Sequence, residues 1–245
     1  MDQSKPQFDQ IPLRMRMTRS HDCAYIEGNQ EQRLAIDLSE DPEAHDKLAL
    51  AGFRRVENWA YKPVCHFCQA CLPLRVNCTR FRSGRNLSRI HKSNQDLTRS
   101  ITDGAVTSEH YILFQEYLTR RHEDGQMSAM SFHEFSNMIH NSPIQTFLVE
   151  YRDVSDELIG CIMMDVQQDG LSAVYSFFDP EASARSLGTF MILDMIELAK
   201  ELGKQYLYLG YYVAESRKMS YKARFSPSEI FRNGKWEPLS VTAEL

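Results

Sequence analysis

Cysteines give the first chemical signal in this sequence. Cys65, Cys68 and Cys71 are each separated by two residues, and Cys23 is a further thiol upstream. This spacing allows thiolates to converge on a zinc ion or an iron–sulfur cluster, and His66 could add a nitrogen ligand. The lack of a second CxxC pair weakens a zinc-finger interpretation. The alternative is a group of reduced thiols in a tight turn, and the sequence leaves both open.

Two basic segments are the second signal, in a chain whose formal net charge is −5. Residues 75–99 carry seven Arg and Lys side chains against one acid, and residues 217–235 carry six against one. Contact with RNA phosphates is electrostatic and needs a basic track more than a particular residue. The first segment supplies such a track for tRNA with Arg80, Arg82, Arg85, Arg89 and Lys92. The alternative is a solvated loop.

Composition excludes several protein classes. With 42% hydrophobic and 25% charged residues, the chain is typical of a folded protein and not of a disordered one. Its apolar runs reach only about five residues, whereas a membrane span needs roughly twenty. Residues 1–10 lack the apolar core of a secretory signal, and six cysteines are too few for a disulfide scaffold. We therefore expect a cytoplasmic protein with neither a membrane nor DNA as a partner.

The first half of the chain contains few regular elements. Asp41-Pro42-Glu43 begins a helix over 42–51 that Gly52 ends, and a strand follows that ends at Pro63. The arginine-rich stretch up to about residue 100 reads as an exposed loop. We place a domain boundary after it, which divides the chain into an N-terminal domain, 1–102, and a second domain, 103–245.

The second half has stronger periodicity. A helix is expected over 109–121, and Ser131 with Glu134 forms a capping box that opens another. Three strands at 145–152, 158–167 and 171–178 read as an antiparallel meander, and Ser186 caps a long helix over 187–202. A strand at 205–213 and a hairpin turn at Asn233-Gly234 complete the order.

This order of elements is that of the GNAT acyltransferase core. We therefore expect an α+β fold, in which a GNAT-like domain with a mixed, largely antiparallel sheet flanked by helices joins a smaller cysteine-containing N-terminal domain. In GNAT folds the acyl donor binds near the start of the long helix, where Arg185, Ser186 and Gly188 stand here. Phe190 replaces a small residue and argues against coenzyme A. Alternatively, Ser186 and Gly188 serve only as a helix cap and a close packing contact.

Several long motifs occur in the order and at the spacings of one family. They are CAY (23–25), GFRR (52–55), YKPVCHFCQACLPLRV (61–76), YSFFDP (175–180), SLGT (186–189), YLYLGYYV (206–213), SRKMSYKARFSP (216–227) and GKW (234–236). Through them, residues 15–237 resemble the aminoacyl-tRNA–protein transferases of the N-degron pathway. Members of that family move an amino acid from a charged tRNA to the N-terminal Asp or Glu of a protein.

The resemblance also implies a donor. Compact bacterial members with the CxxCxAC form, present here at residues 65–71, use leucyl-tRNA, whereas arginine donors are typical of the larger eukaryotic members. We therefore expect leucyl-tRNA and proteins with N-terminal Asp or Glu as partners. Three alternatives stay open: arginyl-tRNA as the donor, a coenzyme A-dependent N-acetyltransferase, and a non-catalytic RNA- or degron-binding module. Larger members are reported to bind an iron–sulfur cluster, and their site matches here only in part, around Cys23 and Cys71.

The chemistry that the resemblance implies needs no metal, covalent nucleophile or other cofactor. An aminoacyl ester is already activated, and an N-terminal amine with a pKa of about 7.7–8.0 is partly neutral in the cell. The enzyme must align the two groups, stabilise the developing oxyanion and remove a proton. The candidates to orient the reacting groups or to relay the proton are Tyr175, Asp179, Tyr211, Tyr212 and Tyr221. Glu215 could act as a base, although a solvated surface acid is the simpler interpretation.

Selecting Asp or Glu over Asn or Gln requires a cation in the acceptor pocket. A charge-assisted hydrogen bond favours the carboxylate by about 1.5–3 kcal/mol. The segment after YLYLGYYV offers four candidates, of which we rank Lys218 and Arg224 above Lys222 and Arg217. Arg54 and Arg75 are rivals from the first half. Some of these cations must instead contact tRNA phosphate or solvent.

Overall fold

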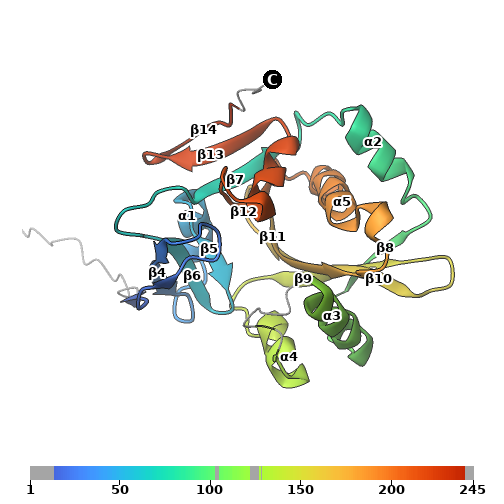
Figure 1. The fold of residues 1–245 in the computed structure, drawn as a ribbon, viewed down its shortest axis with the longest axis horizontal. Coiled ribbons are helices and arrows are strands. Elements are labelled where there is room, and N and C mark those ends of the chain that lie inside the picture. Colours follow the sequence, from blue (N-terminus) through green and yellow to red (C-terminus); the bar gives the residue numbers. More distant parts are fainter. Residues whose placement is uncertain (1–13, 103–104, 122–126, 128, 241–245) are drawn as a thin grey trace, which may run out of the picture.

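The computed structural model describes residues 14–102, 105–121, 127 and 129–240. Within these ranges, strands and helices form a large mixed sheet with helices on both faces and a smaller sheet beside it (Figure 1). The α+β class expected from the sequence is confirmed. Residues 1–10, examined above for a secretory signal, lie outside the described residues.

The smaller sheet belongs to the first 63 residues and is antiparallel, in the order β1-β4-β6-β5. A helix packs beside it, and a short two-stranded hairpin lies between its first two strands in the chain. The elements are β1 (Met15–Met17), β2 (His21–Asp22), β3 (Gln30–Glu31), β4 (Arg33–Asp37), α1 (Ala44–Leu50), β5 (Arg54–Val56) and β6 (Trp59–Pro63). The helix expected over 42–51 is present as α1. The single strand expected before Pro63 is instead a tight hairpin, which turns at Glu57 with a φ of 50°.

The larger sheet has eight strands in the order β14-β13-β7-β12-β11-β10-β9-β8. Every neighbouring pair is antiparallel except β11 and β12. The strands are β7 (Leu72–Asn77), β8 (Thr98–Thr102), β9 (Thr146–Arg152), β10 (Leu158–Val166), β11 (Gly170–Phe178), β12 (Tyr206–Tyr212), β13 (Ser228–Arg232) and β14 (Lys235–Pro238). The expected meander, β9 to β11, and the hairpin turn at Asn233-Gly234 are both confirmed.

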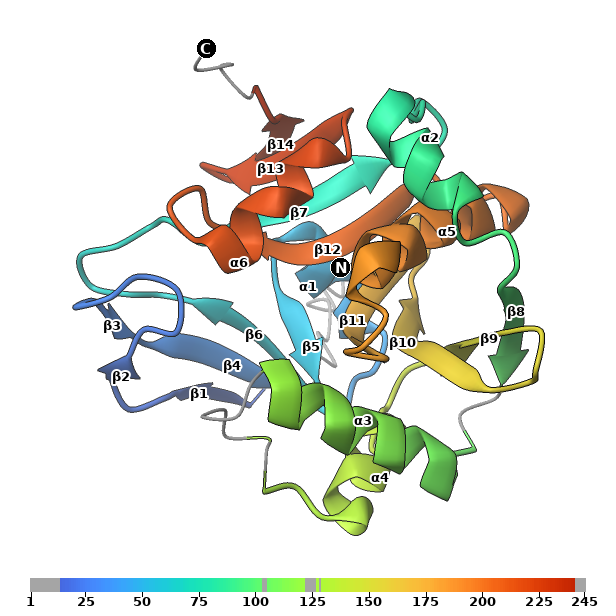
Figure 2. The same cartoon turned by 45° about the vertical axis from the view of Figure 1, so that its right-hand side comes forward.

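Helices cover the two faces of this sheet, two on each (Figure 2). On one face lie α2 (Arg85–Lys92) and α5 (Leu187–Glu201), and on the other lie α3 (Ser108–Arg121) and α4 (Phe132–His140). Neighbouring residues of β10 therefore point to different cores: Ile162 packs towards α5 and Met163 towards α3. Burial on both faces explains why this strand is apolar almost throughout.

Three short helical segments complete the description: η1 (Ser183–Arg185), α6 (Arg217–Ser220) and η2 (Tyr221–Arg224). The capping box at Ser131 and Glu134 is confirmed, because each side chain bonds the other residue's backbone N–H. Ser186 is not the expected side-chain cap of α5. Its backbone is left-handed, with a φ of 53°, and its hydroxyl makes no capping hydrogen bond.

The arginine-rich stretch contains a helix that the sequence did not predict. Leu87 and Ile90 of α2 pack against the core, while Arg85, Arg89 and Lys92 face solvent. Spacings of three and four residues place the apolar side chains on one face of α2 and the basic ones on another. The loop interpretation was therefore wrong for residues 85–92, because three cations on a short helix concealed its apolar face.

Strands from both sides of residue 102 build the larger sheet. β7 lies in its interior, between β13 and β12, and β8 forms its edge next to β9. The division into 1–102 and 103–245 stays a prediction. In the structure, the two segments share one sheet.

One buried ion pair joins the smaller sheet to the larger one. Arg55 on β5 donates two hydrogen bonds of 2.7 Å to the carboxylate of Asp165 on β10, and Thr146 donates a third to the same carboxylate. The two charged side chains are 1% and 0% exposed. Arg55 Nη1 also donates to the carbonyl of Glu57 within its own hairpin, and Nη2 donates to the hydroxyl of Thr146 on β9. The geometry fixes how β5 approaches β10.

We expect Arg55→Ala to lower the free energy of unfolding by about 3–5 kcal/mol, because the variant leaves a buried carboxylate unpaired. Urea unfolding measures this loss. The matched control is Arg232→Ala, which removes the exposed ion pair with Glu237 and should cost less than about 1 kcal/mol. Equal losses in the two variants would contradict the role assigned to the buried pair.

Candidate functional site

The candidate site lies where β11 and β12 separate. These parallel strands pair only between 170–172 and 206–208. Beyond this point β12 bulges, with a register shift between Tyr208 and Tyr211 and a φ of 73° at Gly210. Backbone groups of β11 in the gap are left without a partner strand. Arg54 enters the gap from β5, and its Nη2 donates a 3.0 Å hydrogen bond to the carbonyl of Val174.

Gly210 makes room for this arginine. A Cβ atom at position 210 would lie 2.5 Å from the guanidinium carbon of Arg54, well inside van der Waals contact. The positive φ is a second reason for glycine there, because side chains rarely adopt it. The GYY segment that the sequence singled out for its tyrosines thus contributes a glycine as well.

Arg54 has no acidic partner among the described residues. Its side chain is surrounded by protein yet keeps part of its surface accessible. Four tyrosines from separate segments interact electrostatically with its guanidinium: Tyr25, Tyr61, Tyr211 and Tyr221. Burial alone would lower the pKa of Arg54, but these phenols raise it above its ordinary value. The side chain therefore stays a cation inside an aromatic enclosure.

The tyrosines fall into two groups. Tyr211 is fully buried, and its hydroxyl donates to the carbonyl of Tyr61 at 2.9 Å, so it connects β12 to β6. Tyr175 and Tyr221 both interact with Tyr117 of α3 and form a wall of the gap. Burial raises the pKa of Tyr175 and of Tyr221, which keeps both as neutral phenols able to donate a hydrogen bond.

Lys222 is a second cation with no acid partner among the described residues. It is 6% exposed, and its Nζ donates to the carbonyl of Tyr211 at 2.7 Å. Burial, with the charge of Arg54 as a second cause, lowers its pKa from 10.5 to about 7. Close to neutral pH, Lys222 therefore exists in both protonation states.

Other predicted site residues lie elsewhere or are engaged. Asp179 accepts a hydrogen bond from the backbone of Glu181 in the turn after β11. Tyr212 points away from Tyr211, towards a different cavity. Arg75 lies between the rings of Tyr206 and Trp236, 3.6 and 4.3 Å from their centroids, and forms ion pairs with Glu229 and Asp169. Arg75 is occupied by these structural contacts.

The fold brings the two basic segments together. Arg89 of α2 and Arg224 of η2 line one cavity. Several exposed cations of the two segments form no ion pair with a described residue: Arg80, Arg82, Arg85, Arg89, Lys92, Arg217, Lys218 and Arg224. Arg185 differs, because it pairs with Asp96 and Asn94. A Cβ at Gly188 would meet the ring of Phe178 at 3.2 Å, which supports the packing interpretation of that glycine.

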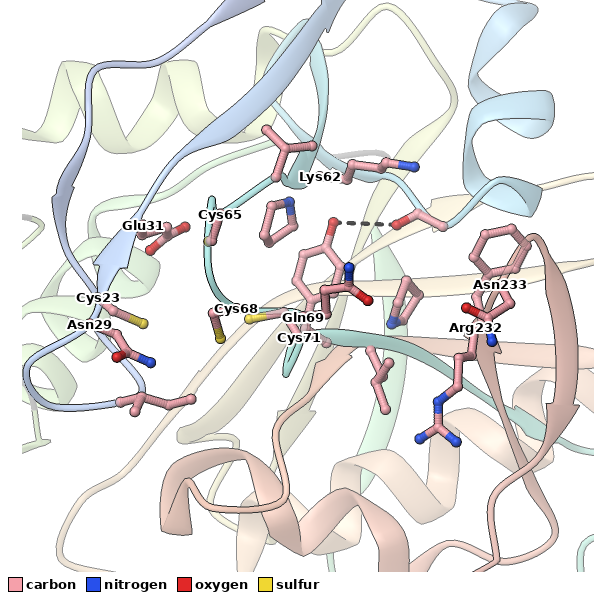
Figure 3. Close-up of a pocket in the computed structure, with 18 of the residues that line it drawn as sticks. Cys23, Asn29, Glu31, Lys62, Cys65, Cys68, Gln69, Cys71, Arg232 and Asn233 are labelled. Carbon is pink, nitrogen blue, oxygen red and sulfur yellow. Dashed lines mark hydrogen bonds between the residues drawn. The ribbon is translucent and has the colours of Figure 1, made fainter.

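The four cysteines line one cavity of about 440 Å³ (Figure 3). Cys23 comes from the segment between β2 and β3, and Cys65, Cys68 and Cys71 come from the loop between β6 and β7; all four are free thiols. Burial, followed by the neighbouring thiols, raises the pKa of Cys71 to about 12. Within the described ranges, no three His, Cys, Asp or Glu side chains are placed to hold a metal ion. The structure thus shows no assembled ligand set among the described residues, and a bound zinc ion or iron–sulfur cluster stays a prediction.

Sequence reasoning missed three tyrosines of the site. Tyr25 and Tyr61 stand in the CAY and YKP motifs, where attention went to the cysteines. Tyr117 is half-buried on α3, four residues after the buried Leu113 and three after the buried Phe114, and its ring packs against that of Phe178. Membership of the two motifs could have identified Tyr25 and Tyr61. The helical spacing of Tyr117 predicts a core side chain, and nothing in the local sequence indicates that it borders the site.

Fold and site together define a GNAT-like acyltransferase fold. A long helix connects two parallel strands that separate at their ends, and cations and phenols gather in the opening. No helix in the described part of the chain has the length and apolar character to cross a membrane.

Comparison with known proteins gives the family. The model for the arginine-tRNA-protein transferase C terminus matches residues 109–232, and the model for its N terminus matches residues 21–89. An aspartate/glutamate leucyltransferase from Granulibacter bethesdensis is 42% identical over 98% of this chain and 90% of that protein. Another from Gluconacetobacter diazotrophicus is 43% identical, over 89% and 84% of the two chains. The chain belongs to the arginine-tRNA–protein transferase family and is a transferase.

A solved structure is also similar in fold. It is the C-terminal domain of a putative lysylphosphatidylglycerol synthetase from Agrobacterium fabrum, with a TM-score of 0.49 and 16% sequence identity. The likeness covers 80% of this chain and 63% of that one.

Replacing Lys222 by Met should stabilise the protein most at low pH. Below pH 7 the wild-type amine is charged in both the folded and the unfolded chain, so the folded state bears the full cost of burying the charge. Between pH 7 and 10.5 the folded chain has released the proton that the unfolded chain still binds, and wild-type stability rises with pH. Urea unfolding at several pH values should therefore show the stability advantage of Lys222→Met shrinking across this window.

The control for this series is Lys218→Met, which removes an exposed amine from the neighbouring turn. Its effect on stability should not vary between pH 6 and roughly pH 9, because an exposed amine keeps its hydration in both the folded and the unfolded chain. A pH-independent difference for Lys222→Met would show that Lys222 titrates normally.

Proposed function

We propose that this protein transfers leucine from leucyl-tRNA to the N-terminal Asp or Glu of acceptor proteins, forming a peptide bond. The names of its relatives support this activity. The observation that carries the proposal is the placement of Arg54, a cation with no acidic partner among the described residues, in the gap between β11 and β12. A reaction of charged tRNA also places the protein in the cytoplasm.

Arg54 provides the acceptor specificity in this proposal. An arginine without a carboxylate partner, enclosed by phenols, is stabilised by an incoming anion. The side-chain carboxylate of an N-terminal Asp or Glu supplies one, whereas Asn or Gln would leave the cation unpaired. Lys222, at the other side of Tyr211, adds positive potential to the same enclosure. Of the six cations considered from the sequence, we assign these two to the acceptor pocket.

The unpaired surface cations provide the donor contact. Arg85, Arg89 and Lys92 of α2 and Arg217 and Lys218 of α6 are exposed, and Arg89 shares a cavity with Arg224 of η2, the segment that follows α6. Phosphates of tRNA would neutralise them with release of counterions, which makes binding dependent on salt. The overall negative charge of the protein does not prevent this, because the cations are concentrated in two segments.

The chemical step needs alignment and one proton transfer. The acceptor amine attacks the ester carbonyl carbon, the bond to the ribose oxygen breaks, the amine gives up a proton, and the departing ribose oxygen takes one up. The neutral phenols of Tyr175 and Tyr221 are suited to donate hydrogen bonds to the developing oxyanion. Lys222, with a pKa of about 7, is suited to take up the proton at neutral pH.

The function is tested with labelled aminoacyl-tRNAs and synthetic peptides. Leucine should appear on peptides that begin with Asp or Glu, and transfer to otherwise identical Asn and Gln peptides should be at least tenfold slower, because the charge-assisted hydrogen bond is lost. Arginyl-tRNA should serve much less well than leucyl-tRNA. Equal or faster arginine transfer would overturn the leucyl assignment, and the absence of any transfer would overturn the enzymatic one.

Gly210→Ala should abolish transfer to Asp peptides without weakening the binding of leucyl-tRNA. The added methyl group cannot coexist with the observed position of Arg54, so the guanidinium must leave the gap. Gly203→Ala is the matched control, since Gly203 has a similar φ of 68° but open space around its Cβ position. Both variants should lose roughly 1–2 kcal/mol of stability from the positive φ, and only Gly210→Ala should lose transfer. Full activity of Gly210→Ala would remove Arg54 from the acceptor pocket.

A further inference from the structure

A groove separates α2 from the residues that precede α5. It is a cavity of about 390 Å³, lined by Asn86, Arg89, Ile90 and Ser93 of the α2 segment, Ala184 and Ser186 of the opposite wall, and Arg224 of η2. This volume lies in the range of sites that hold one small organic ligand. Its lining contains two arginines and no acid.

The two arginines are free to bind a ligand. The guanidinium groups of Arg89 and Arg224 make no hydrogen bond or ion pair with a described residue, and both residues are exposed. Other arginines nearby behave differently: Arg99 pairs with Asp194 and Glu201, and Arg185 pairs with Asp96. The cations left unpaired in this region are thus those that face the groove or the open surface beside it.

A buried polar clamp sets the width of the groove. Asn94, which is fully buried just after α2, donates to the carbonyls of Ile90 and Arg185 at 2.8 and 2.9 Å. Its side-chain oxygen accepts a 2.9 Å hydrogen bond from the guanidinium of Arg185. The end of α2 is therefore tied to η1, so both walls are held in place before any ligand arrives. Arg185 is a positioning residue here.

The groove leads towards the acyl-transfer gap. Arg224 is at one end of η2 and Tyr221 is at the other, and side chains three residues apart in a 3₁₀ helix lie on the same side. Tyr221 interacts with Arg54 and Tyr117, which border the gap. The rise of such a helix puts the two positions about 6 Å apart along its axis. The other wall, at Ala184 and Ser186, follows directly from β11 in the chain.

We infer that this groove binds the single-stranded 3′ end of the aminoacylated RNA and guides it to the gap beside Arg54. Arg89 and Arg224 contact its phosphates, and the side chains of Asn86 and Ser93 offer hydrogen bonds to sugar or base. The double-stranded part of the RNA then rests on the exposed cations outside the groove. The inference rests on the proposed function, since it concerns the donor of that reaction.

The test compares two hairpin RNAs that share the acceptor-stem sequence of a leucine tRNA, one with its single-stranded 3′ end and one without it. Binding to the full-length protein is measured at fixed salt. Wild-type protein should prefer the RNA with the 3′ end by at least tenfold. Arg224→Ala should reduce this preference to less than threefold, because a charge-assisted contact to phosphate is worth roughly tenfold in affinity.

Three further variants make the result specific. Ala184→Trp fills the groove without changing its charge and should also remove the preference. Arg85→Ala and Lys218→Ala remove exposed cations outside the groove and should weaken the binding of both RNAs equally. Thermal unfolding confirms that each variant is folded.

Leucyl transfer by the wild-type protein is measured in parallel. If leucine is transferred and the preference for the 3′ end survives in both Arg224→Ala and Ala184→Trp, the groove is not the binding site, while the proposed function stands. If the wild-type protein transfers nothing and binds both RNAs equally, the donor assignment fails together with the groove.

Discussion

The pairing of Arg55 with Asp165 holds the site together. A guanidinium and a carboxylate removed from water are stable only when their hydrogen bonds are satisfied, and here three donors meet the two carboxylate oxygens. Because side chains alternate along a strand, fixing Arg55 also fixes the direction of Arg54. The smaller sheet thus presents its arginine to a gap in the larger sheet, and neither sheet forms the site alone.

The gap itself follows from the connection between β11 and β12. Two parallel strands joined by α5 pair for three residues and then separate, since the bulge at Gly210 turns β12 away. Arg54 satisfies the carbonyl of Val174, and phenols from four segments enclose the charge. With Lys222 buried nearby, and no acid paired with either cation among the described residues, the enclosure is electrostatically prepared for an anion. In the proposed function, this enclosure is what selects an acidic N-terminus.

The presence or absence of a paired carboxylate also distinguishes structural from candidate binding cations elsewhere in the protein. Arg75, Arg99 and Arg185 are each held by carboxylates within the protein. Arg89 and Arg224 come from segments that are far apart in the sequence, line one groove and lack such partners in the described structure. Sequence distance therefore says little about function here, and the presence or absence of an internal counter-ion says more.

Local patterns in the sequence determined much of the fold. The capping box at Ser131, the three strand-like runs and the periodic stretch after Ser186 each carry their signal within a few residues, and all three kinds of element are confirmed. The motifs also identified the family. Local signals failed at α2, where exposed cations concealed a short apolar face, and at Ser186, where a left-handed backbone replaced a side-chain cap. Only the tertiary structure could decide which of six candidate cations enters the gap between β11 and β12, because that depends on strands paired across more than a hundred residues. The local sequence does not distinguish Arg54 from Arg75. In the structure, Arg54 donates to a carbonyl in the gap between β11 and β12, whereas Arg75 lies between two aromatic rings and pairs with two carboxylates.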